Sequence, residues 1–168
     1  VRAEGIAEKL SSVTWSGEQY VAVGGHKILS SPDGFSWQLR YTYVPGELYA
    51  VCWSGEQFVV VGDSIMMKSP DAKEWSQARV NAVLRDVAAN GDRTIAVGDD
   101  GSVYAAMGND NWTLANVGYA CYAVCSNQGG PDYTAWYGFL VGGNDFQSFG
   151  TDDGLNFGGF DSYPYHLT

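Results

Sequence analysis

A ten-residue stretch that returns along the chain constrains this sequence more than any other feature. Residues 15–24 read WSGEQYVAVG and residues 53–62 read WSGEQFVVVG. A weaker copy, ANGDRTIAVG, begins at Ala89, and a fourth begins near Ser126 with extra residues before Gly143. The spacing is about 36–38 residues, and a fixed period of this size identifies an array of one repeated supersecondary unit. The sequence therefore predicts a repeat protein.

Each repeat divides into four pieces of strand length. A short apolar run is followed by a turn that contains glycine, as in a tight hairpin, and then by the most apolar run of the repeat. Near-continuous Val, Ile and Phe are typical of strands covered on both faces. These second runs are Tyr20–Val23, Phe58–Val61, Thr94–Val97 and Phe139–Val141, and the glycines that end them are Gly24, Gly62, Gly98 and Gly142.

A second motif follows the third predicted strand of the repeats. Ser31–Trp37 and Ser69–Trp75 share Ser, Asp and Trp at matched positions, and Thr151–Phe157 keeps the pattern with Thr and Phe. The third repeat keeps only Trp112. A Ser or Thr hydroxyl and an Asp carboxylate can accept hydrogen bonds from the backbone N–H groups of a turn. We expect the closing aromatic side chain to be buried between neighbouring sheets.

This motif resembles the Asp-box repeats of sialidase-like β-propellers, although the usual Asp box has one more residue between Asp and Trp. The resemblance implies an all-β propeller with four blades of four antiparallel strands, in which Asp boxes are structural and lie away from the ligand face. We expect one domain over residues 1–168, with repeats at about 11–48, 49–84, 85–121 and 122–168. The four blades could close as a small ring, or be completed by oligomerisation or by missing chain.

The net charge of the chain narrows the classes of partner. Nine basic against 19 acidic residues leave a net charge of −10, which disfavours nucleic acid and anionic membrane surfaces. No apolar run approaches the roughly 20 residues that span a bilayer, and we recognise no signal peptide.

Cys121 and Cys125 are too far apart along an extended strand to form a disulfide. We interpret them and Cys52 as free thiols.

Loops from two sets of connections should share one face of a propeller around its axis. One set joins each outer strand to the next inner strand, and the other joins each second strand to the third. Aromatic rings and carboxylates gathered there would suit a sugar or a cationic peptide. The candidate ligand-binding residues are Tyr41, Tyr43, Glu47, Tyr49, Arg85, Tyr119, Tyr122, His26, Asp63, Asp99 and Asp145.

The residues do not support a catalytic site. Sialidases of this fold hold the substrate carboxylate with three arginines, whereas here Arg85 alone begins an inner strand. The acidic loops contain no pair of carboxylates whose spacing marks a glycosidase dyad. His26 and His166 are the only histidines and no Cys-x-x-Cys occurs, so we expect neither a metal nor a cofactor.

The sequence thus favours a non-catalytic recognition module that binds a glycan or a protein, as part of a secreted, cell-surface or virion assembly. The alternatives are a structural or oligomerisation propeller without a ligand, and a glycoside hydrolase whose site is shared between subunits. Partners would be the ligand and either a second copy of the chain or adjoining propeller blades.

One tryptophan has no place in the repeat. The fourth repeat carries extra residues within Ser126–Trp136, which we expect to form an extended hairpin on the face opposite the Tyr-rich loops. Tyr133 and Trp136 would lie along this hairpin and contact a subunit or adjoining domain. The alternative is that Trp136 folds back over the edge of its own blade.

Overall fold

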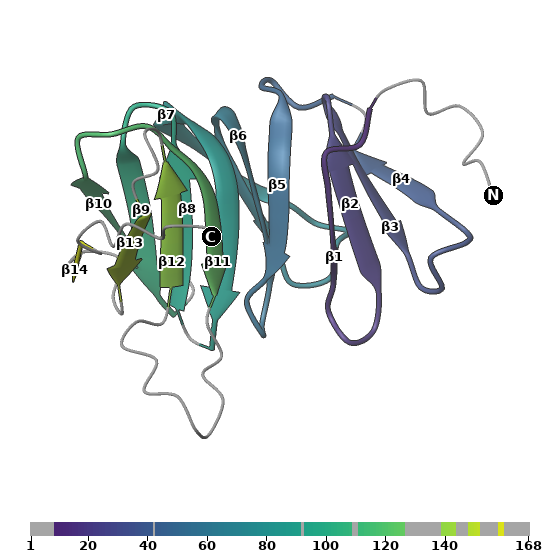
Figure 1. The fold of residues 1–168 in the computed structure, drawn as a ribbon. Helices are drawn as coiled ribbons and strands as arrows, with labels where there is room; N and C mark the ends of the chain where they lie inside the picture. The colour runs from purple at the N-terminus through teal and green to yellow at the C-terminus, as the bar shows by residue number, and fades with distance from the viewer. Residues whose placement is uncertain are drawn as a thin grey trace, which may run out of the picture.

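The computed structural model describes residues 9–41, 43–91, 93–108, 111–126, 139–143, 148–151 and 158–159, and all regular structure there is β-strand (Figure 1). This part of the chain contains no helix long and apolar enough to cross a membrane. The strands are β1 (Ser12–Trp15), β2 (Tyr20–Gly24), β3 (Lys27–Ser31), β4 (Gln38–Tyr41), β5 (Leu48–Trp53), β6 (Phe58–Ser69), β7 (Ser76–Asn90), β8 (Arg93–Gly98), β9 (Ser102–Met107), β10 (Asn111–Asn116), β11 (Cys121–Ser126), β12 (Phe139–Gly143), β13 (Ser148–Thr151) and β14 (Gly158–Gly159).

The strands form three antiparallel sheets, and each follows the order of the chain. The first is β1-β2-β3-β4, and the last is β11-β12-β13-β14. Between them lies a six-stranded sheet with the order β10-β9-β8-β7-β6-β5, which holds the second and third repeats. The first and last sheets lie at opposite ends of the view in Figure 1. We call the four repeat units blades 1 to 4.

The middle sheet has six strands because two predicted connections are part of strands. The connection expected between the outer strand of the second repeat and the inner strand of the third, at Val80–Leu84, is not a loop, because β7 continues through it and pairs with β6 at one end and β8 at the other. No Gly or Pro occurs between Ser76 and Asn90, so nothing in the sequence breaks the extended backbone there. The corresponding connection between the first two repeats contains Pro45 and Gly46.

A turn also lies inside β6. The half of β6 from Phe58 to Gly62 pairs with β5, and the half after Asp63 pairs with β7. Ser64 has a φ of 59°, a left-handed conformation that interrupts an extended strand. The predicted turn between the second and third strands is therefore present at this place.

The glycine that ends each second strand lies under the chain that leads into the inner strand. A Cβ atom at Gly62 would lie 2.1 Å from the carbonyl oxygen of Glu47, and one at Gly24 would lie 2.2 Å from that of Lys9. Gly98 meets the carbonyl oxygen of Val83 in the same way, at 2.8 Å. Real Cβ atoms do not approach so closely, so the contact requires glycine.

In blade 4 the predicted glycine was wrong by one position. Gly143 pairs with Cys121, as Gly62 pairs with Leu48 and Gly98 with Leu84. A Cβ atom at Gly143 would lie 2.4 Å from the carbonyl oxygen of Ala120, whereas one at Gly142 meets nothing within 4 Å. Gly143, and not Gly142, is the equivalent residue.

The core consists of layers between successive blades. Val21, Val23 and Ile28 of blade 1 are buried against Phe58, Val60 and other side chains of blade 2. The next layer joins Ala50, Val59 and Val61 to Leu84, Val87 and Ala96. Trp75 packs against the first layer and Trp112 against the second, as expected for the closing aromatic residue.

The Ser-x-Asp turns have the predicted hydrogen bonds. Asp33 Oδ1 accepts from the backbone N–H groups of Phe35 and Ser36, at 2.8 and 2.7 Å. These N–H groups, with the Ser31 hydroxyl, lower the pKa of Asp33 to about 2. Asp71 makes the equivalent bonds in blade 2. The third copy, Thr151–Phe157, lies mostly outside the described residues.

Two side chains hydrogen-bond across neighbouring inner strands, which the sequence did not reveal. Ser12 Oγ accepts from the Val51 N–H of the next blade at 3.2 Å, and Asp86 Oδ2 accepts from the Val124 N–H at 2.9 Å. Asp86 Oδ1 also accepts from its neighbour Val87 N–H at 2.9 Å. Burial of the Asp86 carboxyl raises its pKa above the ordinary 3.8.

The assignment of Gly143 can be tested against its own neighbour. Gly143→Ala should lower the free energy of unfolding by about 1–3 kcal/mol, because the new methyl group overlaps a carbonyl oxygen. Gly142→Ala should change it by no more than about 0.5 kcal/mol, since the space around it is open. Urea denaturation measures both values. A larger loss for Gly142→Ala would show that the register of blade 4 is wrong.

The raised pKa of Asp86 predicts a pH dependence of stability. The folded protein binds a proton at Asp86 more tightly than the unfolded chain does, so this group stabilises the fold at low pH. Its contribution falls as the pH rises above 3.8 and levels off above the raised pKa. The difference in unfolding free energy between the wild type and Asp86→Asn should therefore decrease with increasing pH. A difference that stays constant or increases would contradict the buried placement of this carboxyl.

Candidate functional site

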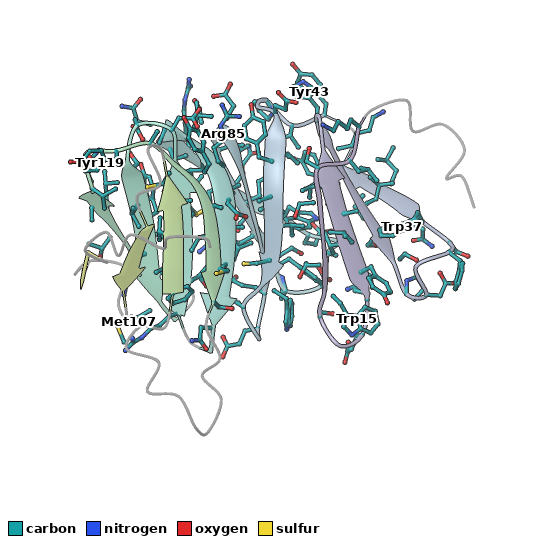
Figure 2. All side chains as sticks on the ribbon, viewed as in Figure 1. Trp15, Trp37, Tyr43, Arg85, Met107 and Tyr119 are labelled. Atoms are coloured by element: carbon teal, nitrogen blue, oxygen red, sulfur yellow. The ribbon has the colours of Figure 1, made fainter. Side chains whose placement is uncertain are left out.

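One face of the molecule carries most of the predicted ligand-binding residues. Tyr43, Arg85 and Tyr119 project from this face in Figure 2, while Trp15 and Met107 lie toward the opposite one. We call this set the rim, and it comprises Tyr43, Glu47, Tyr49, Arg85, Asp99, Tyr119 and Tyr122. The tyrosine side chains are accessible: Tyr43 is 72% exposed, Tyr119 53% and Tyr122 49%.

A bulge at the start of three inner strands places a residue of each on the rim. The pairing with the second strand shifts between Leu48 and Ala50, between Leu84 and Asp86, and between Cys121 and Ala123. The residues left over are Tyr49, Arg85 and Tyr122. β-Bulges commonly redirect a side chain next to a functional site. The same bulge in three blades therefore turns three large side chains toward one face.

Arg85 links the inner strands of blades 2 and 3. Its guanidinium carbon lies 4.5 Å from the centre of the Tyr49 ring, a cation–π contact. Its Nε and Nη2 donate to Asp99 Oδ1 and Oδ2 at 2.7 and 2.5 Å, a bidentate pair. This pair raises the pKa of Arg85, which therefore stays charged at every physiological pH.

Two carboxylates act on the Tyr49 hydroxyl. The Tyr49 hydroxyl donates to Glu47 Oε2 at 3.2 Å. Partial burial, and next the charge of Glu47, raise the pKa of Tyr49, and Asp63 contributes in the same direction. The phenol is thus held neutral, as a hydrogen-bond donor beside two carboxylates.

The corner of blade 1 adjoins the rim at Tyr43. The rings of His26 and Tyr43 stack with their centres 5.9 Å apart, and His26 Nδ1 lies 2.9 Å from the Val44 carbonyl oxygen. The Val44 N–H donates to the His26 carbonyl oxygen, and the Leu48 N–H to that of Gly25. The loop that carries Tyr43 is therefore fixed to the hairpin of the preceding blade.

The remaining predicted residues have other positions. Tyr41 packs against the core layer between blades 1 and 2, because its strand pairs it with buried Ile28. Asp63 is exposed and accepts from the Ser64 hydroxyl at 2.9 Å. Asp145, Tyr133 and Trp136 lie outside the described residues.

A surface hollow of about 450 Å³ lies beside the rim in blade 2. Its lining mixes apolar and polar groups and includes Asp63 and the exposed guanidinium of Arg79. Within the described ranges, no three His, Cys, Asp or Glu side chains come close enough together to hold a metal ion.

The sequence indicates which side chains form the rim, but it does not show the β-bulges that orient them toward this face. The bulges depend on the register between two strands, which a single sequence does not show. Asp86 had a signal, because it occupies the same repeat position as Ser12, but this position was not recognised as one that hydrogen-bonds between blades.

No family model matches the sequence, and no curated protein matches it. Solved structures do match. YCF48 from Cyanidioschyzon merolae superposes with a TM-score of 0.67 at 16% identity, covering 94% of this chain and 57% of that one. A structure of YCF48 bound to a D1 peptide superposes with a TM-score of 0.65 at 17% identity, covering 94% of this chain and 55% of that one.

This chain therefore spans somewhat more than half the length of the YCF48 chains it matches. At this level of identity the similarity establishes the fold and nothing about the ligand. The predicted all-β propeller, with four blades of antiparallel strands in this chain, is confirmed.

Proposed function

We propose that this propeller is a non-catalytic recognition module that binds a segment of another protein on its rim. The observation that carries the proposal is the bulge repeated in three blades, which turns Tyr49, Arg85 and Tyr122 to one face. A propeller that serves only as a spacer would not need a large side chain at the same bulged position of three inner strands.

The chemistry of the rim favours a ligand segment with Lys or Arg side chains. Exposed tyrosine rings attract cations through their faces, and Glu47 and Asp63 add negative charge next to Tyr49. The net charge of −10 would attract such a segment over longer distances. Tyrosine is also common where few residues carry most of the binding energy.

One observation counts against an enzyme related to sialidases. The Arg85 guanidinium is already bound in a bidentate fashion to Asp99, so it is not free to hold a substrate carboxylate. One of the solved propellers that this chain resembles was determined with a bound D1 peptide, which is consistent with a peptide ligand.

A glycan is the second candidate ligand. The exposed rings of Tyr119 and Tyr122 would stack on the apolar face of a sugar, and carboxylates could accept its hydroxyl protons. The sequence motif relates the repeats to the Asp-box type, whose propellers include glycan-binding proteins. A glycan would bind with little dependence on ionic strength, unlike a basic peptide.

Arrays of basic, neutral and acidic peptides, and an array of glycans, test the proposal together. We expect binding to basic peptides that weakens at high salt. Tyr122→Ala should reduce the affinity at least about tenfold, the loss of a central aromatic contact. Phe35→Ala is the matched control, because Phe35 is also an exposed aromatic residue, at 68%, but lies in a Ser-x-Asp turn.

An equal loss of affinity in Phe35→Ala and in Tyr122→Ala would show that the rim is not the binding site. Binding to glycans alone would replace the peptide with a sugar as the ligand. No binding on either array would contradict the proposal and favour the structural role.

A further inference from the structure

The hollow of about 450 Å³ in blade 2 contains an arginine that the rim does not use. Arg79 pairs with Ile65 across neighbouring strands, so both side chains leave the sheet on the face turned toward blade 1. Ile65 is 5% exposed and packs in the core layer, whereas the Arg79 side chain is exposed. The hollow therefore places a guanidinium beside a buried apolar residue.

This guanidinium is available to a ligand, unlike that of Arg85. Arg85 donates to both carboxylate oxygens of Asp99. Arg79 makes no hydrogen bond or ion pair in the part of the chain that the structure describes. The planar guanidinium of arginine matches the geometry of a carboxylate. Arg79 can therefore bind a carboxylate that a ligand brings.

The hollow adjoins the rim through the backbone. Gly46 lines the hollow, and the next residue, Glu47, accepts from the Tyr49 hydroxyl at 3.2 Å. Asp63 also lines the hollow, and its N–H donates to the Glu47 carbonyl oxygen at 2.8 Å. A protein segment bound beside Tyr49 would thus bring a neighbouring residue to the hollow.

The turn at the edge of the hollow differs from those of the adjacent blades. Positive φ falls on Gly25 in blade 1 and on Gly101 in blade 3, but on Ser64 in blade 2. A residue other than glycine adopts this conformation at a cost, and such residues gather at ligand sites. The Ser64 hydroxyl donates to Asp63 Oδ1 at 2.9 Å and so holds this carboxylate in place.

We propose that the hollow binds an acidic side chain of the same protein segment whose basic side chain lies on the rim. This inference rests on the proposed function. Arg79 would bind the carboxylate, while Pro45 and Ala78 of the lining would contact the methylene groups of a Glu or Asp side chain. The basic side chain would lie beside Tyr49. The ligand is then a segment of mixed charge, with its two charges at a fixed separation.

The net charge of this chain makes the proposal easy to recognise in binding data. A charge of −10 repels an acidic residue, so a Glu in the ligand should weaken binding wherever it cannot reach Arg79. At the separation that matches the hollow, the same Glu should strengthen binding. A general electrostatic effect would not change sign with position.

A positional scan of a basic peptide with an amidated C-terminus tests this. Each residue is replaced in turn by Glu and, in a parallel series, by the neutral Gln of similar shape. We expect one position, or two close together, at which Glu binds about three- to tenfold more tightly than Gln. This range lies between the effect of an exposed ion pair and that of an enclosed charged hydrogen bond.

Variants of the hollow identify the residue responsible. Arg79→Gln should abolish the difference between the Glu and Gln peptides, and Arg79→Glu should make Lys the preferred residue at the same position. Lys73→Gln is the matched control. It removes one positive charge from an exposed side chain of blade 2, but Lys73 lies in the Ser-x-Asp turn after β6, so the preference for Glu should remain.

The outcomes separate this site from the rim. If basic peptides bind but Glu weakens binding at every position, the hollow does not bind an acidic side chain, and the proposed function stands. Loss of the preference in Lys73→Gln would also overturn the role of Arg79, because the effect would then come from charge alone. If basic peptides do not bind, both proposals are wrong.

Discussion

The structure depends on one close backbone contact that each blade repeats. The chain that leads into the inner strand crosses the last residue of the second strand, and a carbonyl oxygen takes the place where a Cβ atom would be. Only glycine fits there. Backbone hydrogen bonds from Asp63 to Glu47 and from Asp99 to Val83 hold two of these crossings. The crossing fixes where each inner strand begins.

The position of the inner strand determines both the core and the rim. The inner strand bulges one residue before its regular pairing with the second strand begins, and the bulged residue turns toward the exposed face. The next residue faces the neighbouring blade, where Ser12 and Asp86 hydrogen-bond to its inner strand. The glycines at these crossings therefore determine the orientation of the side chains that we propose to bind a ligand.

Much of the fold was predictable, because strands, hairpin turns and Ser-x-Asp turns depend on local sequence. Asp33 and Asp71 make the expected bonds for that reason. Three features were not. The continuity of β7 follows from an absence of turn residues, which only comparison with the other connections reveals. Because Gly142 and Gly143 are adjacent, the sequence alone does not show which of them lies at the backbone crossing. The bulges, and the burial of Tyr41, depend on pairing between strands, which has no local signal.

The side-chain NMR signal of Arg85 tests the central claim most directly. Its Nε–H bonds to Asp99 and lies beside the face of the Tyr49 ring, so the wild-type signal should be well separated from those of exposed arginines. Gly98→Ala changes none of these side chains, but its methyl group would lie 2.8 Å from the Val83 carbonyl oxygen and displace the start of the inner strand. We expect the Arg85 signal then to move toward those of exposed arginines while the rest of the spectrum keeps its dispersion. An unchanged Arg85 signal in a folded Gly98→Ala variant would contradict it.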